Sequence, residues 1–128
     1  MRQFRWPALW LGAWIAGWLL CIVLSLIHPP QLDVPLPESD KIGHLFAYAA
    51  LSAWAVLIFD TRRARICAAL SLVALGIALE LAQGAFTSDR MMDGLDAFAD
   101  ALGVLAGQCL ALSPARTWLQ RLERRWSR

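Results

Sequence analysis

Four long apolar stretches, separated by short polar segments, dominate the pattern of this chain. They cover about residues 8–27, 41–59, 66–86 and 94–112. Each is close to the roughly 20 apolar residues that a helix needs to cross the hydrocarbon core of a bilayer. The pattern therefore predicts an all-α, polytopic integral membrane protein whose four transmembrane helices form a bundle within residues 1–112.

The segments between these stretches are rich in proline, charged or polar residues, as expected for the connections between helices. Residues 29–40 hold four of the six prolines and three acids, which predicts a non-helical loop. Residues 60–65 are expected to be a short basic turn, and residues 87–93 a polar loop. The first stretch is expected to be a retained helix, because the apolar core of a cleaved signal peptide has about 7–15 residues and ends in small residues.

Residues 113–128 form a basic tail with a second kind of pattern. Trp118, Leu119, Leu122 and Trp126 recur at helical spacing, with arginines between them. This predicts an amphipathic C-terminal helix that lies in the membrane interface.

The positive charges alternate with the apolar stretches. Cytoplasmic loops of membrane proteins carry an excess of Lys and Arg, so the basic segments predict that both the N-terminus and the C-terminus are cytoplasmic. Nucleic acid is not expected as a partner, since topology already explains the basic residues. Ten of the twelve Lys and Arg fall on the predicted cytoplasmic side: Arg2, Arg5, Arg62, Arg63, Arg65, Arg116, Arg121, Arg124, Arg125 and Arg128.

Composition agrees with a membrane location. Hydrophobic residues make up 59% of the 128 residues, above the roughly 45–50% usual in soluble domains. The three cysteines, Cys21, Cys67 and Cys109, lie in apolar stretches without close spacing, which argues against a disulfide framework or a zinc motif. No metal and no cofactor is expected.

Candidate chemistry gathers at the outward-facing ends of three helices. Lys41, His44, Tyr48 and Ser52 share one face of the second helix, because steps of three and four residues return to the same side. In the third, Glu80 lies about 22 Å from the cytoplasmic edge at 1.5 Å per residue, and Gln83 is one turn further out.

The fourth helix brings Asp96, Asp100, Gly103 and Gly107 to one stripe. The two glycines form a close-packing motif that turns both aspartates toward the bundle interior. Ionisable groups in hydrocarbon cost at least about 2.5–3.5 kcal/mol each, so they must pair or line a wet cavity. Such a set is a functional-site hypothesis, although buried polar residues can also serve only to fix helix register.

The polar residues form four spaced motifs in order along the chain. These are D-K-x-x-H-x-x-x-Y (Asp40, Lys41, His44, Tyr48), E-x-x-Q (Glu80, Gln83), Arg90, and D-x-x-x-D-x-x-G-x-x-x-G (Asp96, Asp100, Gly103, Gly107). In that order they resemble the VanZ-like family of small bacterial membrane proteins over about residues 38–110. The resemblance implies a multi-pass protein of the bacterial inner membrane, with an envelope-related role. The family name comes from an association with resistance to a glycopeptide antibiotic, and no catalytic assignment carries over.

The chain departs from the family at Asp100, where the family often has Asn. The extra carboxylate could hold a cation, or it could be protonated, since a nearby like charge and a low dielectric both disfavour the charged form.

The leading hypothesis is a site that binds or processes an anionic envelope lipid or a lipid-linked wall precursor, such as a polyprenyl phosphate. Lys41 and Arg90 would contact the phosphate, and His44 with Glu80 is the candidate catalytic proton-transfer pair. The other candidate ligand-binding residues are Tyr48, Gln83, Asp96 and Asp100.

Three alternatives remain open. The protein could be a non-enzymatic membrane adaptor or accessory protein that binds an envelope partner or a second copy of itself. Ion-coupled transport fits intramembrane carboxylates, but the cytoplasmic halves of the helices lack charges. A metal hydrolase would suit the His and carboxylates, but a spacing such as H-E-x-x-H is absent.

Overall fold

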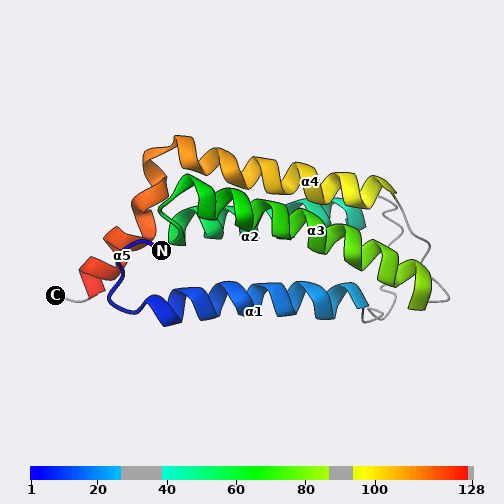
Figure 1. The fold of residues 1–128 in the computed structure, drawn as a ribbon, viewed down its shortest axis with the longest axis horizontal. Helices are drawn as coiled ribbons and strands as arrows, with labels where there is room; N and C mark the ends of the chain where they lie inside the picture. Colours follow the sequence, from blue (N-terminus) through cyan, green and yellow to red (C-terminus); the bar gives the residue numbers. More distant parts are fainter. Residues whose placement is uncertain (27–38, 87–93, 127–128) are drawn as a thin grey trace.

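The structure is a computed structural model that describes residues 1–26, 39–86 and 94–126. Within these ranges it is all-helical and contains no strand. Four long helices lie side by side, with a short fifth helix at one end of the bundle (Figure 1). In chain order the elements are α1 (Pro7–Leu26), α2 (Ser39–Ile58), α3 (Arg62–Phe86), α4 (Gly94–Gln108), two 3-10 turns, η1 (Cys109–Leu112) and η2 (Pro114–Thr117), and α5 (Trp118–Trp126).

The prediction of four membrane-length helices is confirmed. The helical spans Pro7–Leu26, Lys41–Ile58, Arg62–Ala85 and Gly94–Leu112 are each long and apolar enough to cross a membrane. Large apolar side chains cover the outside of the bundle, among them Leu70 and Leu105, which are more than 60% exposed. Such a surface suits lipid contact, because a soluble monomer rarely exposes so continuous an apolar face.

Three helix boundaries differ from the sequence prediction. Helix α2 begins at Ser39, two residues inside the segment expected to be a loop. The basic segment 60–65 was expected to be a turn, but α3 already begins at Arg62. Thr61 explains the early start, since its hydroxyl accepts a hydrogen bond from the backbone N–H of Ala64 at 3.3 Å, as an N-cap residue does. The fourth span keeps its predicted end at Leu112, but its last turn tightens into the 3-10 geometry of η1.

Helices α2 and α4 form the most extensive interface of the bundle. A Cβ atom at Gly103 would collide with the backbone of Leu45 and Ala49. A Cβ atom at Gly107 would collide with the backbone of Ala49 and Ala53 and with the side chain of Ser52. The two glycines therefore allow the α2 and α4 backbones to touch, as expected for small residues four apart in a membrane helix.

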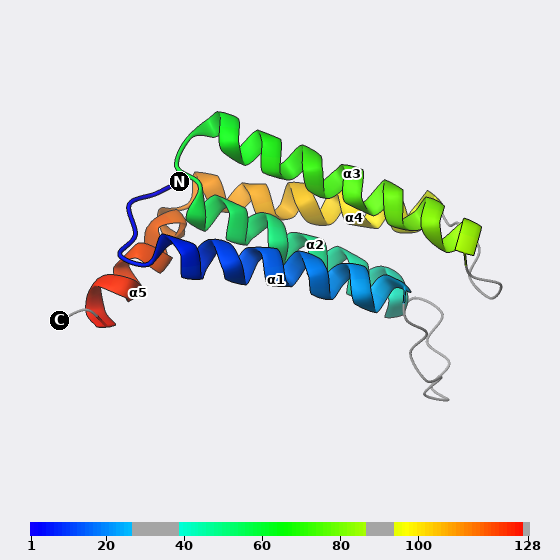
Figure 2. The same cartoon turned by 60° about the horizontal axis from the view of Figure 1, so that its bottom comes forward.

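A row of tryptophans attaches α1 to α2, which lie beside each other in Figure 2. The indole of Trp14 donates a hydrogen bond to the carbonyl of Leu51 at 3.0 Å, and its ring meets the ring of Phe59 edge-on. The indole of Trp54 donates to the carbonyl of Trp10 at 3.2 Å. These indoles serve helix packing, because each N–H is satisfied by the neighbouring helix.

The N-terminal segment and helix α5 lie at the same end of the bundle (Figure 1). Helix α5 buries Leu119 and Glu123, while Trp118 and Trp126 remain more than half exposed. The Glu123 carboxylate accepts hydrogen bonds from the backbone N–H groups of Arg5 at 2.7 Å and Trp6 at 3.1 Å, and from the Trp10 indole at 2.8 Å. A side chain of the tail thus caps the beginning of α1, which the pattern of apolar residues in the tail does not indicate.

Candidate functional site

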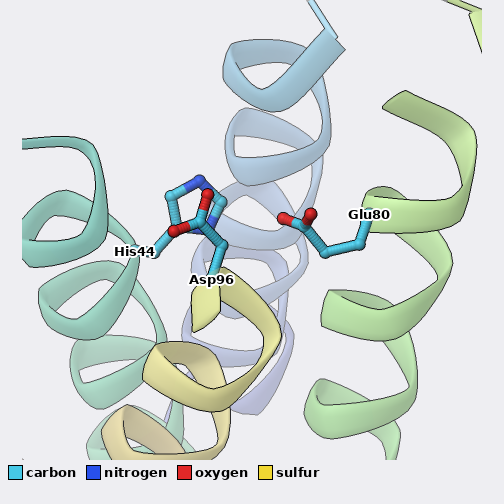
Figure 3. A group of neighbouring side chains, drawn as sticks. All are labelled: His44, Glu80 and Asp96. Atoms are coloured by element: carbon cyan, nitrogen blue, oxygen red, sulfur yellow. The ribbon is translucent and has the colours of Figure 1, made fainter. Parts of the chain in front are cut away.

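A cluster of three ionisable side chains lies between helices near the end of the bundle opposite the termini (Figures 1 and 3). His44 comes from α2, Glu80 from α3 and Asp96 from α4. One nitrogen or oxygen atom of each lies within 4.8 Å of the other two. Glu80 is only 3% exposed, so this cluster belongs to the interior of the bundle and not to its rim.

Asp100 positions the imidazole of His44. Its Oδ1 lies 3.0 Å from Nδ1 of His44, and the Asp100 side chain is 2% exposed. A carboxylate at Nδ1 favours the tautomer that carries its proton on this nitrogen, which makes Nε2 the hydrogen-bond acceptor of the ring. Gly76 of α3 makes room for this arrangement, since a Cβ atom there would lie 2.6 Å from Oδ2 of Asp100.

Lys41 supplies a positive charge at the outer edge of the cluster. Its Nζ lies 3.9 Å from Oδ1 of Asp96, and its side chain is 30% exposed. Lys41 and His44 are three residues apart on α2, and Asp96 and Asp100 are four apart on α4. The contacts of Lys41 with Asp96 and of His44 with Asp100 therefore both follow from one helix register, in which matching faces of α2 and α4 meet.

The polar residues nearest this cluster have packing roles. Gln83 donates a hydrogen bond to the carbonyl of Ser25 at 2.8 Å, which ties α3 to α1. One and two turns inward from His44 on α2 lie Tyr48 and Ser52, which are 1% and 0% exposed. Ser52 donates to the carbonyl of Val104 at 2.7 Å and accepts from Gln108 at 2.9 Å.

Tyr48 differs from Ser52 because its hydroxyl makes no conventional hydrogen bond within the described residues. The hydroxyl lies beside the thiol of Cys21, a weak hydrogen-bonding group, and near the carboxylates of Asp100 and Glu80. Buried hydroxyls normally have a strong partner. Tyr48 is therefore a group that a bound molecule or water could satisfy from the side of the cluster.

Most of the predicted site residues meet in this region. His44, Glu80, Asp96 and Asp100 form its centre, Lys41 lies at its edge, and Tyr48 and Gln83 border it on α2 and α3. Arg90 and Asp40 lie outside the side chains that the structure describes. For the proposed proton-transfer pair, His44 has its close contact with Asp100, while Glu80 approaches within 4.8 Å.

The sequence left a metal site formed by the histidine and the carboxylates as an alternative, but it did not show that one nitrogen and two carboxylate oxygens come within 4.8 Å of one another. A search for ligands at fixed spacing in one helix finds nothing, because these three come from three different helices. The sequence indicated only that the three residues lie at a similar depth along their helices. It did not give the distances between their side chains.

The arrangement has three chemical capacities. The His44–Asp100 pair resembles the oriented imidazole of acid–base sites, in which a carboxylate fixes the tautomer and Nε2 exchanges the proton. Lys41 offers an ammonium group to an anion, and the oxygens of Glu80 and Asp96 offer ligands to a cation.

The fold and the site together define a small helical protein with four membrane-length spans and a buried polar cluster toward one end of its bundle. The chain matches no family model, and comparison with curated proteins and with solved structures found no match. The functional argument therefore rests on the residues of the site.

Proposed function

We propose that this chain is a VanZ-like, multi-pass protein of the bacterial inner membrane that binds or processes an anionic envelope lipid or a lipid-linked wall precursor. The single observation that carries the proposal is the buried cluster of His44, Glu80, Asp96 and Asp100 at one end of a bundle of membrane-length helices. Charged groups inside a membrane are costly and mark binding or transfer sites.

The orientation in the membrane follows from the distribution of charge around the bundle. With the termini in the cytoplasm, the cluster faces outward, at the level of the outer-leaflet headgroups. The positive-inside tendency supports this orientation. The described arginines at the terminal end of the bundle are Arg2, Arg5, Arg62, Arg63, Arg65, Arg116, Arg121, Arg124 and Arg125.

Helix α5 would then lie at the cytoplasmic surface of the membrane. Its exposed Trp118 and Trp126 suit the headgroup region, where amphipathic aromatic rings are enriched. Its exposed Arg121, Arg124 and Arg125 suit contact with anionic lipids. Residues 113–128 would thus form a surface-bound tail attached to the four-helix domain.

A lipid phosphate would enter the site beside Lys41. The ammonium group is partly exposed at the outer edge of the cluster, where it can reach both a headgroup and Asp96. Arg90, which precedes α4 in the sequence, would add a bidentate phosphate contact. The hydroxyl of Tyr48 would face the inner side of the bound headgroup.

If a bond is broken in this lipid, His44 is the group best prepared to transfer a proton. Asp100 orients its ring, and Glu80 lies within 4.8 Å of it, a separation that one water molecule can bridge for proton transfer. Asp100 would then be a positioning residue, and His44 with Glu80 would be the catalytic pair.

A second candidate function is that of a non-enzymatic membrane adaptor, in which the polar cluster only holds the bundle together. The bonds of Gln83 to Ser25 and of Ser52 to Val104 favour it, because they show polar side chains of these helices serving as packing contacts.

Native mass spectrometry in a mild detergent separates the two functions. We expect the wild-type protein to retain an anionic lipid, and we expect Lys41→Gln and Arg90→Ala to lose it while remaining folded. Arg62→Gln is the matched control, because it removes one exposed charge at the opposite end of the bundle. Equal and nonselective lipid binding by all four proteins would refute the lipid site and leave the adaptor function.

A further inference from the structure

The cluster of His44, Glu80 and Asp96 has the composition of a metal-ligand set. It offers one imidazole and two carboxylates, with one ligand atom of each within 4.8 Å of the others (Figure 3). On a tetrahedral zinc ion with bonds of about 2.0–2.2 Å, ligand atoms lie about 3.4 Å apart. Binding would therefore draw the three side chains closer together, and Glu80 has three side-chain torsions through which its carboxylate can shift.

The surroundings of the cluster prepare it for a cation. The side chains of His44 and Asp96 are 12% and 14% exposed, and Glu80 is buried. Asp100 holds the Nδ1 side of His44, which is the contact that typically orients a metal-binding histidine and raises its basicity. Gly76 leaves the space in which Asp100 makes this contact.

The charges favour a divalent ion. Glu80 and Asp96 approach each other in a region of low dielectric, where two carboxylates repel strongly. Asp100 adds a third carboxyl group behind His44. Lys41 supplies one positive charge to this group, with its Nζ 3.9 Å from Oδ1 of Asp96. A divalent cation would reduce the repulsion among the carboxylates further and would also present positive charge to an incoming phosphate.

We propose that His44, Glu80 and Asp96 bind a divalent first-row transition metal ion, with Asp100 as the positioning residue for His44. The mixture of imidazole and carboxylate suits Zn²⁺ or Mn²⁺ better than Mg²⁺, which prefers oxygen ligands alone. Three protein ligands leave a coordination position open for a phosphate oxygen or water. This last role rests on the proposed function, whereas the binding of the metal does not.

The test measures Zn²⁺ binding to the full chain in mild detergent after treatment with a chelator, by isothermal titration. We expect one Zn²⁺ per wild-type chain, and we expect Mg²⁺ to compete poorly. Glu80→Gln and Asp96→Asn should each abolish this stoichiometric binding, and Asp100→Asn should weaken it by about tenfold, as loss of an outer-shell partner does. Asp60→Asn is the matched control, since it removes an exposed carboxylate near the opposite end of the bundle and should bind as the wild type does.

Absence of stoichiometric binding by the wild type would overturn the metal site, as would equal binding by Glu80→Gln, Asp96→Asn and Asp60→Asn. X-ray absorption of the zinc-loaded wild type tests the ligand set directly, without variants whose folding could be impaired. One imidazole nitrogen together with carboxylate oxygens supports the site, and a spectrum without imidazole overturns it.

Lipid retention by chelated and zinc-loaded protein separates the two proposals. If zinc binds to the three ligands but neither form retains an anionic lipid, the metal site stands and the proposed lipid function fails. If zinc does not bind and the chelated protein retains the lipid, the lipid function stands and the metal site fails.

Discussion

Replacing Glu123 with Gln is expected to release α5 from the end of the bundle. The carboxylate accepts three hydrogen bonds, from the backbone N–H groups of Arg5 and Trp6 and from the indole of Trp10. The first two donors lie just before α1, where N–H groups lack partners within the helix and a negative charge is stabilised by the helix dipole. Glu123 therefore fixes both the tail and the start of the first span.

The size of the effect follows from these three contacts. A hydrogen bond to a charged group contributes about 1.5–3 kcal/mol, roughly twice the contribution of a neutral one. In Glu123→Gln the remaining oxygen can still accept from Trp6 and Trp10. The amide NH₂ group, however, is a donor that faces the N–H of Arg5, so this hydrogen bond is lost. Losing one bond and the charge of the other two should cost about 2–4 kcal/mol of docking free energy. At 1.4 kcal/mol per factor of ten, the undocked state becomes about 30- to 700-fold more populated.

Hydrogen–deuterium exchange in detergent measures this undocking. We expect faster exchange of the backbone amides of α5 in Glu123→Gln, while the amides of α2 and α4 remain protected. Arg125→Gln is the control, because it removes an exposed charge from the same helix and should leave the exchange of α5 unchanged. Unaltered exchange of α5 in Glu123→Gln, or an equal increase in Arg125→Gln, would refute the reasoning.

Acid should have the same local effect as this substitution. Burial raises the pKa of the Glu123 carboxyl, but the N–H groups of Arg5 and Trp6 and the Trp10 indole outweigh burial and hold the pKa below its ordinary value of 4.5. The contribution of Glu123 to stability is therefore complete above pH 4.5 and is lost as the pH falls through the lowered folded-state pKa. Exchange of α5 in the wild type should increase in that acidic range, and Glu123→Gln should show little of this increase.

Three further predictions concern the bundle and are measured by thermal unfolding and, for the second and third, also by Zn²⁺ titration, all in detergent. Gly107→Ala should destabilise the fold by about 1–3 kcal/mol through overpacking against α2, whereas Gly43→Ala, where an added Cβ meets nothing within 4 Å, should be neutral or slightly stabilising; equal effects would contradict the close helix contact. Gly76→Ala should displace Asp100 and lower Zn²⁺ affinity more than it lowers stability, and unchanged affinity would show that Asp100 does not act through His44. Ser52→Ala should cost about 1–2 kcal/mol and leave Zn²⁺ binding intact, and a loss of binding would place Ser52 in the site.

The helices were predictable because a bilayer-length apolar run has few other uses. Residues 8–27 and 41–59 correspond to α1 and α2 within two residues at each boundary. The predicted start of α3, at residue 66, was four residues too late. Hydropathy marks where a helix enters the apolar region, and not where the helix begins. The capping bond of Thr61 decides the true start, and it depends on local geometry that an arginine-rich segment does not reveal.

The site was predictable as a level in the bundle but not as a set of contacts. Depth along three helices placed His44, Glu80 and Asp100 together, because rise per residue is nearly constant. Which carboxylate His44 contacts depends on helix rotation and tilt, which apolar periodicity fixes only coarsely. Glu123 shows the same limit, since it is the only acid among residues 113–128 and its partners lie more than 110 positions earlier.

The close contact of α2 and α4 links the packing of the bundle to the chemistry of its site. Gly103 and Gly107 bring the two backbones together one to two turns inward from Asp100, which fixes the height and rotation of α4 on α2. That register sets the approaches of Lys41 to Asp96 and of His44 to Asp100 at once. Glu80 arrives from α3, whose interfaces with both α2 and α4 are smaller. The α2–α4 half of the site is therefore held by backbone contact, and the position of Glu80 is the part of the site that a bound ion or headgroup has most freedom to adjust.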